Sequence, residues 1–252
     1  MIWHTRGGNG PTTVLLLHGL GATGAVWTGV CQQLESRPLR WISPDLGGHG
    51  LSPWQDSYSV GQLAAEVAPL VRQAEPLFVV GHSLGVYVGL ALASRWFGVR
   101  VAGLLGIGPK IQWSAADLQG TRELAARPSR WYPQSAEAWT RYRRVSGLEI
   151  PVTSDAAPLA RGITQGTEGW RLSHDPRTFL VAGAPFSTLA ATSDTRLALA
   201  RGAGDPMVSL AELQQYDPGA REIASAGHNV HVEKPTAVVE LLDELLAAGK
   251  LD

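Results

Sequence analysis

Short runs of apolar residues alternate with longer segments of helical periodicity along most of this chain. The runs span three to seven residues, a length that suits buried strands and is too short for buried helices. Strands that are apolar on both faces need helices on both faces, which is the arrangement of a parallel sheet. Five runs are expected to be strands: 14–17, 41–43, 77–80, 101–107 and 196–200.

The segments between these runs have the spacing of amphipathic or buried helices. The last of them, 235–248, begins with Pro235 in its first turn and repeats valine and leucine at helical spacing. The chain is therefore predicted to be an α/β protein with a mostly parallel central sheet and helices on both faces. The other expected helices are 26–34, 60–74, 85–95 and 208–214.

The alternation breaks between residues 110 and 175. No short apolar run can be picked out there, and four of the nine tryptophans fall in this segment. We expect a helical cap, or lid, over 110–175, inserted into a core domain made of residues 1–109 and 176–252.

The cap carries two groups of candidate binding residues. Its aromatic side chains could line an apolar substrate pocket, with packing of the cap's own core as the alternative. Three arginines, Arg141, Arg143 and Arg144, could favour an anionic group, with a solvated surface as the alternative. The candidate pocket residues are Trp113, Trp131, Trp139 and Tyr142.

Residues 77–85 read Leu-Phe-Val-Val-Gly-His-Ser-Leu-Gly and lead into an apolar helical segment. A strand, a Gly-x-Ser-x-Gly turn and a helix in this order form a nucleophile elbow. Gly81 and Gly85 permit the sharp turn that lifts the Ser83 hydroxyl clear of the sheet. Ser83 is therefore the candidate nucleophile, and a glycine-rich turn with an idle serine is the alternative.

A second glycine-rich turn, His18-Gly-Leu-Gly21, follows the first apolar run. Such a turn lets a backbone N–H approach a substrate oxygen closely. The N–H groups of Leu20 and Leu84 are predicted to form an oxyanion hole. An ordinary strand-to-helix turn is the alternative.

A serine hydroxyl needs a base, and the base needs a third group to hold its tautomer. Of the seven histidines, His228 is the best placed, because it follows Gly227 in a loop after an expected strand at 221–223. Such a loop points to the edge of the sheet where open α/β sheets place ligands. His231 lies closer to the last helix and is expected to be structural.

Asp205 is the candidate acid because it follows the 196–200 run in a glycine-containing loop. Pro206 makes a helix-capping role the alternative for this aspartate. Asp194 and Asp217 fit less well, since Asp194 precedes its strand and Asp217 lies beside Pro218 in an expected turn.

The chain order Ser83, Asp205, His228 is that of the α/β-hydrolase triad, and the chain resembles the α/β-hydrolase superfamily over essentially all of its length outside the cap. It is most similar to small capped serine carboxylesterases, cofactor-free haloperoxidase-like esterases and related lyases. The resemblance implies a structural role for the 45–52 loop, and Ser83 argues against the epoxide and halide chemistry of relatives with aspartate there. Two positions depart from the family pattern, Gly47 and Val86. The segments that carry the resemblance are 18–21, 45–52, 81–85, 204–208 and 227–235.

The expected function is a serine hydrolase that cleaves a small carboxylic ester through an acyl-enzyme on Ser83. A lyase, a carbon–carbon bond hydrolase or a thioesterase on the same triad is the first alternative. A small-molecule receptor with this fold and no turnover is the second, because a fold does not fix a reaction.

Composition restricts the partners. The 21 basic and 22 acidic residues leave a net charge of -1, which argues against a general nucleic-acid binder. The single cysteine, Cys31, excludes a disulfide framework and a thiolate metal cluster, and no metal or cofactor is expected. No apolar stretch approaches the roughly 20 residues that span a bilayer, and no secretory signal is evident, so we expect a cytoplasmic protein. The sequence leaves the oligomeric state open.

Overall fold

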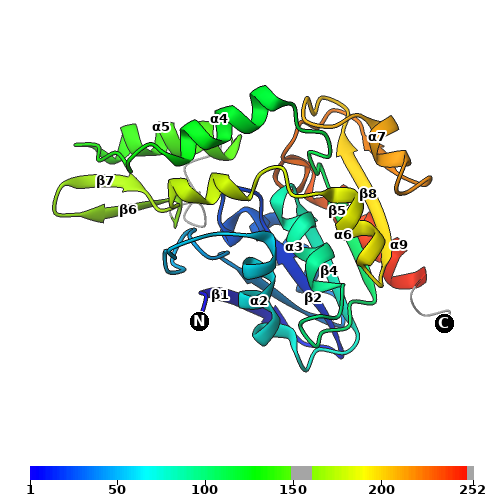
Figure 1. Ribbon diagram of the computed structural model, residues 1–252. Coiled ribbons are helices and arrows are strands. Elements are labelled where there is room, and N and C mark those ends of the chain that lie inside the picture. The colour runs from blue at the N-terminus through cyan, green and yellow to red at the C-terminus, as the bar shows by residue number, and fades with distance from the viewer. Residues whose placement is uncertain (149–160, 249–252) are drawn as a thin grey trace.

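The computed structural model describes residues 1–148 and 161–248. A seven-stranded sheet runs through the molecule in the order β1-β3-β2-β4-β5-β8-β9 (Figure 1). Every neighbouring pair is parallel except β1 and β3. The strands are β1 (His4–Gly8), β2 (Thr12–Leu17), β3 (Leu39–Pro44), β4 (Leu77–His82), β5 (Gly103–Ile107), β8 (Arg196–Gly202) and β9 (Arg221–Ile223).

The predicted mostly parallel sheet is confirmed. Four of the five apolar runs lie within strands, the fifth, 101–107, begins two residues before β5, and the expected 221–223 strand is β9. The edge strand β1 was not predicted, because its sequence His-Thr-Arg-Gly-Gly contains no apolar run. Its residues pair along one side only and are largely half-buried, so their polarity costs little.

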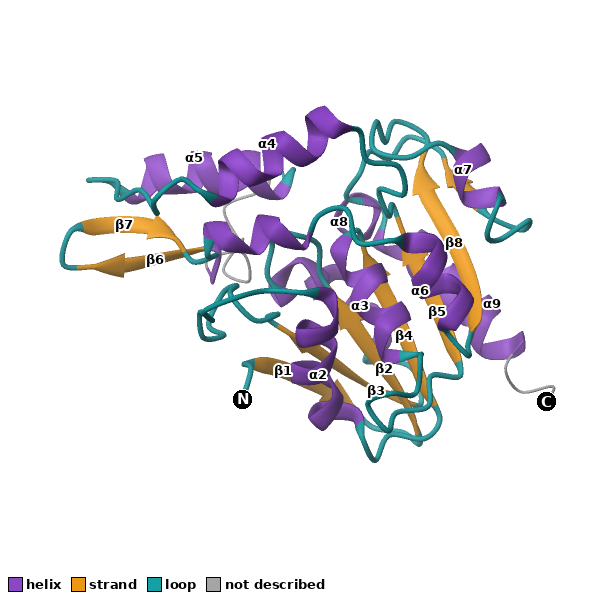
Figure 2. Ribbon diagram, viewed as in Figure 1, coloured by secondary structure: helices purple, strands orange, loops and turns teal. Residues whose placement is uncertain are grey.

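Helices cover both faces of the sheet (Figure 2). One apolar cluster packs under α2 (Val60–Val71), α3 (Leu84–Leu92) and α6 (Phe186–Thr192), and a second packs under α1 (Thr28–Leu34) and α9 (Pro235–Ala248). Every residue of α3 is buried, as its uniformly apolar sequence requires. Short helices complete the layers: η1 (Gly24–Trp27), η3 (Pro176–Val181), α7 (Leu210–Gln214) and α8 (Val230–Glu233).

The sheet register brings distant segments to one edge. His82 at the end of β4 is level with Ile107 of β5, and Ile107 is level with Ala200 of β8. Ala200 is in turn level with Arg221 at the start of β9. The loops that leave these four strands therefore begin at the same edge, as parallel pairing dictates.

The described parts of the predicted cap, 110–148 and 161–175, lie beyond this edge of the sheet (Figure 1), and residues 149–160 of it lie outside the described residues. The segment contains the helices α4 (Ala115–Ala125) and α5 (Ser135–Ser146). It also contains an antiparallel hairpin of β6 (Ile163–Gly166) and β7 (Gly169–Leu172), which the sequence did not lead us to expect in the predicted helical cap. Four-residue strands of mixed polarity leave no apolar run to detect. Among the described residues, no helix is long and apolar enough to cross a membrane.

Candidate active site

Ser83 lies in the tight turn between β4 and α3. Its φ of 50° is in the left-handed region that side chains rarely adopt, and its N–H donates to the Ile107 carbonyl at 2.9 Å. A Cβ on Gly81 would lie 2.6 Å from the Gly85 carbonyl carbon, and one on Gly85 would lie 2.1 Å from the Leu17 oxygen. Both positions of the Gly-x-Ser-x-Gly pattern therefore require glycine for a steric reason.

Asp205 and His228 lie on the loops that follow β8 and β9, and their side chains meet. The Asp205 Oδ2 atom is 2.9 Å from His228 Nδ1, and Asp205 Oδ1 accepts a hydrogen bond from the Met207 N–H at 2.8 Å. Asp205 is 3% exposed, so its carboxylate is held in a fixed orientation. A carboxylate accepts hydrogen bonds, so this contact places the imidazole proton on Nδ1 and leaves Nε2 as the basic nitrogen.

Gly108 makes room for this contact, and the sequence analysis did not identify it. It follows β5 with a φ of 58°, and a Cβ there would lie 2.9 Å from Asp205 Oδ2 and 3.2 Å from His228 Nδ1. A glycine directly after a predicted strand, level with the elbow, was the signal that could have identified it.

A cavity of about 40 Å³ lies beside Ser83. Leu20 and Leu84, the predicted oxyanion-hole residues, line it together with Ser83. Leu84 is the first residue of α3, where backbone N–H groups have no partner within the helix. The other lining residues are Tyr87, Lys110, Trp113, Val181, Ala182, Gly183 and Ala184.

Of the four aromatic residues predicted for a substrate pocket, the structure brings only Trp113 to this cavity. Tyr142 is 1% exposed in the core, and Trp139 packs against it with ring centroids 5.6 Å apart. Trp131 packs against the Arg171 guanidinium at 5.2 Å. These three residues therefore contribute to packing of the 110–175 segment.

Tyr87 and Lys110 line the cavity and were missed by the sequence analysis. The Tyr87 hydroxyl and the Trp113 Nε1 both donate to the Lys110 carbonyl, which fixes one wall. The Lys110 ammonium pairs with Asp117 at 3.0 Å. Tyr87 lies in α3, whose apolar sequence has the pattern of a helix that is buried all round, so it was indistinguishable from a core residue.

Two buried histidines support the loop that carries His228. The Nε2 atom of His82 lies 3.0 Å from the carbonyl oxygen of His228. The ring centroids of His82 and His231 are 4.3 Å apart. His231 is fully buried against Trp27, at 4.4 Å between ring centroids. Burial lowers the pKa of His231 to about 3 and holds the pKa of His82 well below its usual value. Both rings are therefore neutral near pH 7. Asp205 pairs with His228 and not with His231.

The 45–52 loop packs against the turn that carries Leu20. Asp45 is fully buried and accepts from the Gly24 and Leu51 N–H groups, while Arg161 pairs with it at 3.1 Å. His49 Nε2 accepts a hydrogen bond from the Gly21 N–H at 3.1 Å. These contacts connect the loop to the backbone and to the 110–175 segment, and they hold the turn at 18–21 in place.

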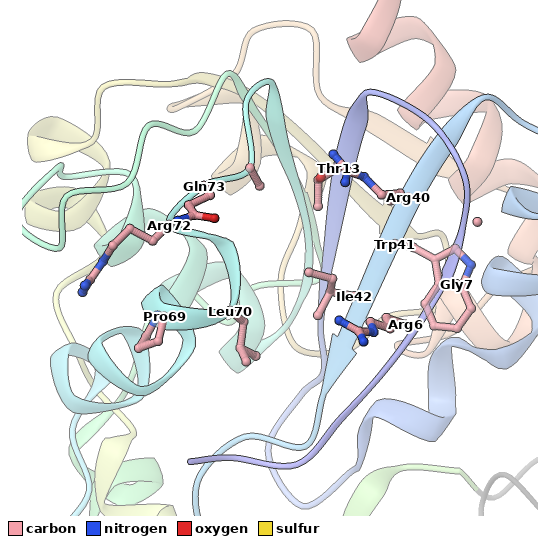
Figure 3. Close-up of a pocket in the computed structure, with 12 residues that line it drawn as sticks. Arg6, Gly7, Thr13, Arg40, Trp41, Ile42, Pro69, Leu70, Arg72 and Gln73 are labelled. Carbon is pink, nitrogen blue, oxygen red and sulfur yellow. The ribbon is translucent and has the colours of Figure 1, made fainter.

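A larger groove, of about 890 Å³, lies along β1, β3 and the end of α2 and contains none of the predicted site residues (Figure 3). Arg6 and Arg40 lie on the neighbouring strands, and Arg72 lies across from them (Figure 3). Across the described part of the chain, no group of three or more histidine, cysteine, aspartate or glutamate residues is arranged to hold a metal ion.

Comparison with known proteins identifies the family. The model of the alpha/beta hydrolase family matches residues 14–241, and the chain belongs to this family. It is 31% identical over 174 residues to Lipase LipV of Mycobacterium tuberculosis, a match that covers 66% of this chain and 64% of that protein. The matched part thus spans less than two thirds of the lipase.

Two further proteins are similar over most of the chain. Esterase Rv0045c of Mycobacterium tuberculosis is 27% identical over 260 residues, covering 95% of this chain and 84% of the esterase. The structure of a thioesterase domain from the curacin biosynthetic pathway superimposes with a TM-score of 0.74 at 24% identity, covering 94% of this chain and 93% of that domain. The second likeness establishes the fold alone.

Proposed function

We propose that this protein hydrolyses small carboxylic esters through an acyl-enzyme on Ser83. The observation that carries the proposal is the meeting of Asp205 with His228 at 2.9 Å, at the sheet edge where Ser83 stands in its strained turn. The similarity to a lipase and an esterase supports ester hydrolysis as the reaction.

In the proposed mechanism, His228 Nε2 removes the Ser83 proton as Oγ attacks the ester carbonyl carbon. Asp205 keeps the imidazole in the tautomer with the proton on Nδ1 and stabilises the imidazolium that forms. The oxyanion accepts hydrogen bonds from the Leu20 and Leu84 N–H groups. The carbon–oxygen bond of the tetrahedral intermediate then breaks, and His228 gives its proton to the leaving alcohol.

Water releases the acyl group in the second half of the reaction. His228 removes a proton from the water as its oxygen attacks the acyl carbon, and the Ser83–acyl bond breaks with return of the proton to Oγ. The cavity beside Ser83 is small, at about 40 Å³, which favours a short acyl chain. Its apolar lining favours an uncharged acyl group.

The test measures kcat/KM on p-nitrophenyl acetate. Ser83→Ala should lower it by about 10⁴-fold or more, and Asp205→Asn by about 10³- to 10⁴-fold, because the imidazole loses its orienting carboxylate. Asp194→Asn is the matched control, because this exposed aspartate pairs with Arg95 away from the site. Wild-type turnover by Ser83→Ala would contradict the proposal.

Covalent labelling tests the nucleophile without knowledge of the natural substrate. A serine-reactive phosphonate should modify the peptide that contains Ser83 in the wild-type protein and leave Ser83→Ala unlabelled. A matched panel of an oxygen ester, a thioester and a β-diketone should show the ester as the preferred substrate. Preference for the thioester or the diketone would replace ester hydrolysis with one of the other reactions of this triad.

A further inference from the structure

A second hollow, of about 690 Å³, lies on the 110–175 segment and shares no lining residue with the cavity beside Ser83. It runs between the end of α4, one face of α5 and the stretch from Leu172 to Phe179. We call it the arginine groove, because four of its lining residues are arginines and none is an aspartate or glutamate. The four are Arg127, Arg130, Arg141 and Arg144.

The guanidinium groups of the groove carry uncompensated charge. Among the described residues, none of the four arginines has a carboxylate oxygen within 4.0 Å. Two other arginines of the same region are paired, Arg161 with Asp45 and Arg177 with Asp175. Positive charge is therefore concentrated around one hollow.

Arg141, Arg143 and Arg144 were predicted together as candidates for binding an anionic group, but they do not all lie on the same face of α5. Arg141 and Arg144 are three residues apart, which places them on the same face of the helix, and both line the groove. Arg143 lies between them in sequence and does not line it. The chain thus supplies its own control residue, of the same type, on the same helix and next to a groove residue.

A buried polar side chain gives an independent sign of a ligand. His174 lines the groove, is 5% exposed, and has no hydrogen-bond partner on either ring nitrogen. Buried polar side-chain atoms in folded proteins nearly always have a partner. Burial lowers the pKa of His174 to about 3, so the ring is neutral and has one N–H to donate. The adjacent carboxylate, Asp175, is occupied by Tyr58 and Arg177.

The rest of the lining defines the body of the ligand. Apolar side chains make up much of it, and the Arg130 guanidinium lies 4.9 Å from the Tyr132 ring centroid, so an aromatic surface is part of the wall. A ligand that matches this surface has an apolar body and more than one negative charge. The apolar and aromatic lining residues are Leu124, Pro128, Tyr132, Val145, Leu172, Pro176 and Phe179.

We propose that the arginine groove binds a small organic phosphate, with its phosphoryl oxygens on the guanidinium groups and the His174 N–H and its apolar body on the aliphatic and aromatic wall. A phosphate monoester carries about two charges and three strong acceptor oxygens near pH 7, which suits several guanidinium forks better than a single carboxylate does. This proposal does not depend on the reaction at Ser83.

The experiment is isothermal titration of the whole protein with phenyl phosphate at low salt. Saturable one-site binding is expected for the wild-type protein. Arg141→Gln/Arg144→Gln should weaken it by about tenfold or more, because two charge-assisted contacts are lost. Arg143→Gln should change it by less than about twofold. Ser83→Ala should bind as the wild type does, which separates this site from the proposed ester hydrolysis.

Three further arms define the chemistry. Inorganic phosphate and phenol should each bind at least about fivefold more weakly than phenyl phosphate, because each lacks half of the recognised surface. His174→Phe keeps a ring and removes both nitrogens, and should weaken phenyl phosphate by about fivefold. Arg141→Lys/Arg144→Lys keeps the charge and loses the planar fork, so an intermediate affinity is expected. This pair also serves if the glutamine variant fails to fold.

Several results would overturn the proposal. One is the absence of saturation by phenyl phosphate up to about 10 mM, because a specific site is expected to bind more tightly than that. Another is a loss of affinity in Arg143→Gln equal to that in Arg141→Gln/Arg144→Gln. If inorganic phosphate bound as tightly as phenyl phosphate, the groove would not recognise the organic part of the ligand. Binding of a polyglutamate peptide without binding of phenyl phosphate would make the groove a docking surface for an acidic protein.

Discussion

The carboxyl edge of the sheet and the 110–175 segment that lies over it hold their side chains in different ways. At the sheet edge, backbone packs directly on backbone: a Cβ on Gly85 would lie 2.1 Å from the Leu17 oxygen. The segment is held to the core mainly by side chains instead, with a backbone hydrogen bond from the Asp175 N–H to the Gly48 carbonyl at 2.8 Å at its end. Arg161 pairs with Asp45 at 3.1 Å and lies 4.0 Å from the Trp3 ring centroid, and Trp54 Nε1 donates to the Ser173 carbonyl at 3.0 Å.

Because of this difference, the sheet edge can hold side chains precisely, and the 110–175 segment can accept changes of side chain. A side chain on a backbone that cannot shift is held to a fraction of an ångström, which the proposed proton transfer between Ser83 and His228 would require. Side-chain contacts can be exchanged one at a time without moving the sheet. We infer that changes in what the protein binds are tolerated in the 110–175 segment, and that changes at the sheet edge are not.

Alanine substitution of two helical glycines gives the largest contrast. Gly85→Ala should cost about 3 kcal/mol of unfolding free energy, because the new methyl group meets the Leu17 backbone. Gly120→Ala, in α4 of the 110–175 segment, should stabilise the protein by about 0.5 to 1 kcal/mol, because a Cβ there has nothing within 4 Å. Urea unfolding of both variants measures the two changes.

Gly61→Ala is the control for this contrast. Gly61 also lies in an exposed helix position with open space for a Cβ, but it belongs to the core domain. It should behave as Gly120→Ala does. Equal stability of Gly85→Ala and Gly61→Ala would show that the sheet edge is as adaptable as the segment above it.

Acid should destabilise the protein through its buried histidines. Burial lowers the pKa of His18 to about 4 and the pKa values of His49, His174 and His231 to about 3, and it also lowers that of His82. Each ring charges near pH 6.5 when the chain unfolds, so the unfolded state binds more protons below that pH. Stability is then full above about pH 6.5 and falls as the pH drops toward 4, by up to about 1.4 kcal/mol per pH unit for each ring.

Urea unfolding at pH 8, 7, 6 and 5 measures how the free energy of unfolding changes with pH. Two variants show whether the buried histidines cause this slope. His231→Phe should lower the slope by one ring's share, up to about 1.4 kcal/mol per pH unit, because the fully buried ring against Trp27 no longer titrates on unfolding. His4→Gln, on the edge strand β1, should leave it unchanged. A free energy of unfolding that stays constant from pH 7 to pH 5 would contradict the prediction.

The smallest effect concerns the acyl group of the proposed substrate. Trp113→Ala should enlarge the cavity beside Ser83 and raise kcat/KM for p-nitrophenyl hexanoate relative to the acetate by about tenfold, since a few added methylene groups gain apolar contact. Trp131→Ala is the matched control, because this tryptophan packs against Arg171 and does not line the cavity. The same shift in both variants would mean that the 110–175 segment acts on selectivity as a whole.

The sequence predicted most of the sheet and one residue from each of three loops at its edge. The runs at 14–17 and 77–80 lie inside β2 and β4, and the helix expected over 235–248 has the bounds of α9. These predictions rest on local patterns, since a buried strand or an amphipathic helix carries its signal within a few consecutive residues. The hairpin of β6 and β7 carries no such signal, because its short strands mix polar and apolar residues.

The residues that surround the candidate site were harder to predict. Gly108 and Lys110 reach it only because β5 lies between β4 and β8 in the sheet. Among the cap aromatics, the sequence had no means to separate Trp113, which lines the cavity, from Tyr142, which is buried in the core. Both are large apolar side chains on helix-rich segments, and composition alone does not distinguish an outward face from an inward one.

The positions of most core strands along the chain, the glycine-bounded serine turn and the positions of Asp205 and His228 after their strands were determined by the sequence alone, because each depends on residues that are neighbours along the chain. Only the tertiary structure decided which side chains from distant segments lie together. It brings Asp205 to His228, and it places Arg141 and Arg144 around one groove with His174 while Arg143 does not line that groove. Such contacts depend on the relative placement of elements that are far apart in the chain, and that placement is set by packing of the whole core.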